Sequence, residues 1–146
     1  MVSESARMNS AAEARFRVQA PASARGVVMV VALDAASEGV AARLAAASWN
    51  HARFLTASAG NLLDDIETAD QVVMIASPGG HAHAAAEVGA ACSARRIMTT
   101  ALITGAEAAS DEALSNTLAQ LRPWSLMVVI ANSDDYIEDV LTALRA

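Results

Sequence analysis

Residues 69–86 constrain the fold of this chain most, because they join an apolar run, a glycine-containing turn and the start of an alanine-rich helix. Val72 to Ala76 is an unbroken apolar run of the kind found in a parallel strand that is covered on both faces. Pro78 lacks an amide donor and ends the strand, while Gly79 and Gly80 permit positive φ or a close backbone approach. This order of strand, glycine turn and helix is the geometry that places a ligand over a helix N-terminus.

Four further apolar runs alternate with helical segments along the chain. We expect strands at Val27–Leu33, Arg53–Ala57, Ile97–Thr104 and Leu126–Ala131. Helices are expected at Ala35–Ser48, from the glycine turn to about Ala94, from Ser110 to Arg122 and at Asp134–Arg145, with a short helix or turn at Asn61–Thr68. Such alternation predicts right-handed crossovers and helices on both faces of the sheet. The expected fold class is α/β, a three-layer Rossmann/flavodoxin-like domain with a five-stranded, mainly parallel sheet centred on Val27–Leu33 and Val72–Ala76.

The length of 146 residues suits one domain, and 54% hydrophobic with 18% charged residues is typical of a globular chain. Residues 1–25 show no clean period, so we expect a flexible N-terminal tail, with an interaction arm as the alternative, before a single α/β domain at 26–146. No apolar run approaches the roughly 20 residues of a membrane span, so no membrane association is expected.

Charge and cysteine content narrow the classes of function. A net charge of −6 argues against nucleic-acid binding, which needs clustered positive charge. All ten basic residues are arginine, which excludes a Schiff-base lysine and the phosphate-binding lysine of a P-loop. The single cysteine, Cys92, rules out an internal disulfide and favours a reducing, cytoplasmic location. Because it lies among alanines, we expect Cys92 to be a small core residue.

Candidate ligand-binding residues follow the ends of the expected strands, where parallel sheets bind their ligands. They are Asp34, Ser77, Gly79, Gly80, His81, His83 and Asn132. The amides of the glycine turn and the N-terminus of the following helix favour an anion. Asp34 and Asn132 favour a ligand with hydroxyl or amide donors over a highly charged phosphate.

Simpler roles are open for the same residues. Asp34 stands at the N-cap position of a helix, and the two glycines can serve only to make the turn. Two histidines at i and i+2 point in roughly opposite directions on a helix, and no third ligand lies at a familiar spacing, so no metal site is expected. Ser77 lacks the flanks of a hydrolase nucleophile, and we expect it to be a hydrogen-bonding loop residue. The sequence identifies no catalytic residue and no cofactor.

From about Val27 onward, the order of these segments resembles the nucleotide-binding half of the FtsZ/tubulin family. The segments that carry the likeness are the strand Ala69–Ala76 with Gly79-Gly80 and Ala84–Ala86, the next strand at Met98–Thr104, and Met127–Asn132, which is similar to the family's strand with an asparagine near the nucleotide. The central stretch also resembles sugar-isomerase (SIS) domains, with a strand, Ser-x-Gly and a helix, over less of the chain.

Two loops depart from the FtsZ/tubulin pattern. Residues 81–84, His-Ala-His-Ala, replace most of the family's glycines and threonines, and residues 33–36, Leu-Asp-Ala-Ala, place a carboxylate where phosphate would lie. The resemblance therefore implies a shortened, degenerate relative without GTPase activity. Such a relative would be a small-ligand-binding or regulatory domain, whereas the SIS likeness implies an enzyme or enzyme subunit acting on a phosphorylated or anionic metabolite. The expected partners are a small anionic or nucleotide-like ligand, and a second copy or another protein.

Overall fold

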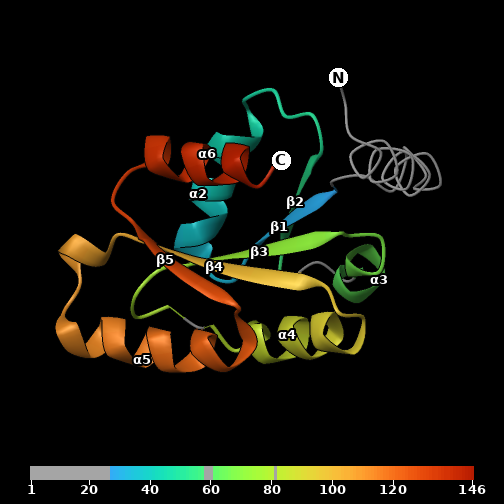
Figure 1. Cartoon of the computed structure of the whole chain (residues 1–146). Coiled ribbons are helices and arrows are strands. Elements are labelled where there is room, and N and C mark those ends of the chain that lie inside the picture. Colours follow the sequence, from blue (N-terminus) through green and yellow to red (C-terminus); the bar gives the residue numbers. More distant parts are fainter. Residues whose placement is uncertain (1–26, 58–60, 81) are drawn as a thin grey trace, which may run out of the picture.

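The computed structural model describes residues 27–57, 61–80 and 82–146, so the tail expected at residues 1–25 and the candidate His81 lie outside the described residues. The apolar runs form five strands: β1 (Val28–Ala32), β2 (Ala52–Thr56), β3 (Gln71–Ala76), β4 (Met98–Thr104) and β5 (Met127–Ala131). They make one sheet in the order β2-β1-β3-β4-β5, and every neighbouring pair is parallel (Figure 1). The expected parallel sheet with an interior first strand is confirmed.

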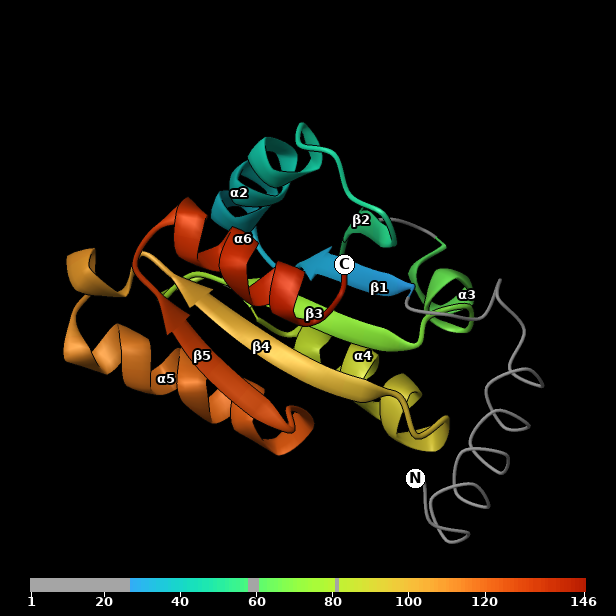
Figure 2. The same ribbon diagram turned by 45° about the horizontal axis from the view of Figure 1, so that its top comes forward.

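Helices cover both faces of this sheet. They are α2 (Ala35–Ala45), α3 (Leu62–Ile66), α4 (Ala84–Ala94), α5 (Asp111–Leu121) and α6 (Asp134–Ala143), with short 3₁₀ turns η2 (Ala106–Ala108) and η3 (Arg122–Trp124). Helices α2 and α6 pack on one face, and α3, α4 and α5 pack on the other (Figures 1 and 2). The predicted three-layer α/β class is therefore confirmed, with element ends displaced by a few residues.

The central strands are apolar throughout because both of their faces are buried. In β3, Val72 and Met74 face the core under α3, α4 and α5, while Val73 and Ile75 face the core under α2 and α6. Each of these four side chains is fully buried. Burial of such a side chain stabilises the fold by roughly 1.5–3 kcal/mol, so β3 and its neighbour β1 anchor both layers.

One helix ends earlier than predicted. The helix expected to reach Ser48 stops at Ala45, and Ala47 beyond it is exposed. The indole N–H of Trp49 donates a hydrogen bond to the carbonyl of Leu44 at 2.7 Å. The same carbonyl also accepts a hydrogen bond from the Ala47 amide at 3.1 Å, so the two bonds together close the end of the helix.

Candidate functional site

Asp34 follows β1 and joins the loops after β1 and β3. Its Oδ1 accepts hydrogen bonds from the Ser37 amide (2.8 Å) and the Ser77 hydroxyl (2.7 Å), and its Oδ2 accepts one from the Ser77 amide (2.8 Å). The predicted N-cap of α2 is thus confirmed, and Ser77 has the predicted hydrogen-bonding role. The helices after β1 and β3 pack on opposite faces, which makes this junction the switch point where α/β sheets commonly bind ligands. The chain's own carboxylate fills that position.

The loop after β3 is a tight turn with the chemistry of a type II turn. Pro78 occupies its second position, Gly79 its third with φ +81°, and the Gly80 amide donates to the Ser77 carbonyl at 3.1 Å. The Gly79 amide donates to the Thr117 hydroxyl of α5 at 3.3 Å. The amides of Ser77, Gly79 and Gly80 are therefore hydrogen-bonded within the chain, whereas we expected the amides of this turn to face an anion.

The absence of a side chain at Gly80 lets the two loops approach closely. A Cβ at this position would lie 2.7 Å from Oδ2 of Asp34. A contact that short displaces one of the two groups, so the Asp34 carboxylate requires Gly80, whereas the positive φ of the turn falls on Gly79.

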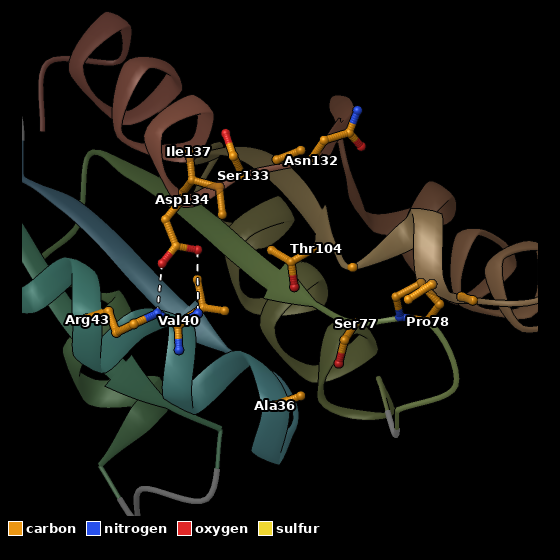
Figure 3. A pocket seen from close by; sticks show the side chains of 14 residues that line it. Ala36, Val40, Arg43, Ser77, Pro78, Thr104, Asn132, Ser133, Asp134 and Ile137 are labelled. Carbon is orange, nitrogen blue, oxygen red and sulfur yellow. Dashed lines mark hydrogen bonds and ion pairs between the residues drawn. The ribbon is translucent and has the colours of Figure 1, made fainter.

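An open cavity of about 420 Å³ lies beside this junction, at the carboxyl ends of β3, β4 and β5. Helices α2 and α6 form its other walls (Figure 3). Its polar lining residues are Arg43, Ser77, Thr104, Asn132, Ser133 and Asp134. Its volume falls within the range of small-molecule sites.

Like Asn132, Thr104 is a polar residue of this cavity whose side chain the described fold leaves unused. It is the last residue of β4 and is 9% exposed. Its hydroxyl makes no hydrogen bond with any other residue in the described part of the chain. Figure 3 shows Thr104 between Asp134 and Ser77. A ligand atom can therefore hydrogen-bond to this hydroxyl without breaking a hydrogen bond between described residues.

An ion pair crosses the cavity from α2 to α6. Arg43 Nε lies 2.7 Å from Asp134 Oδ2, and Arg43 Nη2 donates to Oδ1 at 3.4 Å (Figure 3). The hydrogen bond and charge of Asp134 raise the pKa of Arg43. Since Arg43 and Asp134 are the charged residues that line the cavity and they neutralise one another, the cavity suits a polar ligand with little net charge.

The predicted site residues do not form one cluster. Ser77 and Asn132 line the cavity described above, although Figure 3 shows the Asn132 amide directed away from Ser77. Gly79 and Gly80 instead line a smaller cavity of about 310 Å³ against α5. Asp34 lies between the two and lines neither.

The other candidate side chains lie elsewhere. His83 immediately precedes α4 with an exposed side chain and lines neither of the two cavities. Cys92 is 1% exposed in the core, as predicted, and burial raises its pKa to about 11, which keeps it a neutral thiol. Among residues 27–57, 61–80 and 82–146, no three His, Cys, Asp or Glu side chains are grouped as a metal site requires. In the same ranges, no helix has the length and apolar character of a membrane span.

Sequence reasoning missed Thr104, Arg43 and Asp134. Thr104 carried a usable signal, because it ends an expected strand at the same sheet edge as Ser77 and Asn132. Arg43 and Asp134 are 91 positions apart, and no local pattern connects them. No protein-family model matches this chain, and no curated protein matches its sequence.

Proposed function

We propose that this chain is a small-ligand-binding or regulatory domain, and that the cavity at the ends of β3, β4 and β5 holds its ligand. The observation that carries the proposal is the Thr104 hydroxyl, which lies in the cavity wall on a residue that is 9% exposed and has no hydrogen-bond partner among the described residues. A ligand group that hydrogen-bonds to this hydroxyl contributes about 0.5–1.5 kcal/mol to binding.

The lining favours a ligand with an apolar side and several hydroxyl or amide groups. Val40 and Ile137 supply apolar contacts from α2 and α6, and the hydroxyls of Ser77 and Thr104 lie at the strand ends. The Asp34 carboxylate bonded to Ser77 disfavours a highly charged phosphate nearby. A reducing, cytoplasmic location is part of the proposal, since it fits a single buried cysteine.

A degenerate FtsZ/tubulin-type relationship without GTP hydrolysis belongs to the same proposal. Two features support the lack of hydrolysis. The turn amides after β3 are already hydrogen-bonded, and the chain contains no lysine. Few donors are then left to stabilise charge on a transferring phosphoryl group. We expect GTP turnover by the full chain at the buffer background, and turnover above background that is lost in Gly79→Val would contradict this part.

The second candidate is an enzyme or enzyme subunit acting on a phosphorylated or anionic metabolite. Arg43 favours it, because this guanidinium lines the cavity near the N-terminus of α6, where anions are stabilised. An anion must displace Asp134 to reach Arg43. Arg43→Gln would therefore weaken an anionic ligand strongly and a neutral ligand little, which separates the two candidates.

A thermal-shift panel followed by calorimetry tests the site. The panel pairs neutral polyols, nucleosides and amides with their phosphorylated counterparts, and we expect the neutral member of a pair to stabilise the chain more. The best compound is then titrated into Thr104→Val, which removes the hydroxyl and keeps the shape of the side chain. Loss of one hydrogen bond of about 1 kcal/mol predicts roughly fivefold weaker binding.

Thr100→Val is the matched control. Thr100 lies on the same strand, points to the same face and is 6% exposed, but it does not line the cavity. Its replacement should leave the affinity unchanged. Equal effects of the two variants, or no stabilising compound in the panel, would count against the proposed site.

A further inference from the structure

Strand β5 forms an open edge of the sheet with exposed apolar side chains (Figure 2). Leu126 is 74% exposed, and Met127 and Ile130 are each 44% exposed. Its inner side pairs with β4, and its outer side has no strand neighbour within the described residues. The outer backbone N–H and C=O groups of such a strand form a ready template for another strand.

The devices that usually protect an edge strand are missing from β5. The segment from Trp124 to Ser133 contains no charged residue and no proline. The pairing with β4 runs in unbroken register from Met127 to Ala131, so no bulge twists the edge away. The opposite edge, β2, carries the exposed charge of Arg53. The two edges of the sheet therefore differ in their capacity to accept a partner.

Exposed apolar groups lie on both faces of the β5 edge. Val129 packs with the core under α2 and α6, and Val128 packs with the core under α4 and α5. Because successive side chains alternate, Met127 points to the α6 face and Ile130 to the α5 face. A partner strand at this edge would cover both of these side chains at once.

We propose that two copies of the chain associate by antiparallel pairing of their β5 strands about a two-fold axis. Each chain has a net charge of −6, so copies repel one another except where a surface is uncharged. At every register, self-pairing of Trp124–Ser133 matches uncharged residues with uncharged residues. Self-pairing of β2 would bring two Arg53 side chains near each other. The contact is isologous and closes as a dimer.

Helices on both sides of β5 extend this contact. Helices α6 and α5 flank the strand on opposite faces (Figures 1 and 2), and Tyr136 of α6 is 46% exposed. Continuing the sheet across the axis brings each helix toward its copy, and because α6 carries the exposed Asp135 and Asp139, the uncharged strand and not α6 supplies the attraction.

Sedimentation velocity of the full chain across a wide concentration range tests the dimer. We expect a monomer–dimer equilibrium for the wild type. Ile130→Lys places a charge on the edge of each copy and should weaken the dimer at least about tenfold. Leu63→Lys is the matched control, because Leu63 is 42% exposed on α3 and lies away from β5. It should leave the equilibrium unchanged.

Met127→Lys repeats the test on the other face of the strand, in case Ile130→Lys fails to fold by circular dichroism. Amide hydrogen exchange of the wild type adds a readout that needs no variant, since β5 should gain protection with rising concentration while β2 should not. A wild type that stays monomeric, open-ended assemblies, or a dimer that survives both lysine variants would overturn the proposal. Association only with another protein's strand would also overturn it.

Discussion

The carboxyl edge of the sheet has a closed half, between β1 and β3, and an open half, at the ends of β3, β4 and β5. Between β1 and β3, one Asp34 carboxylate accepts three hydrogen bonds, and Gly80 packs directly against it. At the ends of β3, β4 and β5, the Thr104 hydroxyl has no partner among the described residues, and a Cβ on Gly105 would meet no atom within 4 Å. A switch point shows where the loops of a sheet diverge, but a ligand can use it only if the chain has not already filled it.

Removal of the Asp34 side chain should have the largest effect on stability. Asp34→Ala loses the cap of α2 and both bonds to Ser77, and it should lower the free energy of unfolding by about 3 kcal/mol. Asp34→Asn keeps the shape and one acceptor and should lose about half as much. Urea unfolding measures both variants. A loss below about 1 kcal/mol for Asp34→Ala would show that the closed half is not held by this carboxylate.

Gly80→Ala should come next, because its Cβ would lie 2.7 Å from Oδ2 of Asp34. We expect a cost of about 2 kcal/mol from this overpacking. The same change in an Asp34→Ala background, where the two nearest atoms are gone, should cost less than half as much. A double-mutant cycle measures the coupling. Independent effects of the two changes would place the strain in the turn itself.

On the open half, Gly105→Ala should cost less. Gly105 has φ +71°, and a Cβ there meets no atom within 4 Å, so only the left-handed backbone opposes the substitution. That strain is about 1 kcal/mol, and Gly105→Asn should recover part of it. The free energies of unfolding in urea of Gly105→Ala and Gly105→Asn measure these two costs. A loss for Gly105→Ala equal to that for Gly80→Ala would remove the contrast between the two halves.

The Arg43–Asp134 pair should contribute least to stability. Both side chains are largely exposed, at 61% and 42%, so water and salt screen their attraction. We expect Arg43→Gln to give the smallest change of the series, and this change should disappear at high ionic strength. Thermal unfolding at low and high salt measures it. A large, salt-independent loss would show that Arg43 holds α2 and α6 together through packing.

Local patterns predicted the elements of the fold but only part of the site. The apolar run Val72–Ala76 can be buried only between two layers, and Asp34 before an alanine-rich segment is a cap signal whatever surrounds it. The turn chemistry of Pro78 and Gly79 is also local. Such signals need no knowledge of distant residues, and for this reason they located the strands, the cap and the turn.

Contacts between distant segments could not be predicted in the same way. Ser77 meets Asp34 across 43 positions, and Asp134 meets Arg43 across 91. In the first contact, the Ser77 amide, which lies in the loop that sequence reasoning assigned to a ligand, donates to Asp34 instead. In the second, Arg43 and Asp134, the charged residues that line the cavity, neutralise one another. Both contacts depend on the order of the strands in the sheet. The alternation of strands and helices along the chain does not determine that order.

The central claim is that a ligand binds at the open half and not at the switch point. The most direct test is a series of ¹H–¹⁵N spectra of the full chain during titration with the most stabilising compound of the thermal-shift panel. The account predicts the largest shifts at the amides of Gly105, Asn132 and Ser133, which line the open cavity. Largest shifts at Gly79, Gly80 and Asn116, which line the cavity against α5, would contradict it.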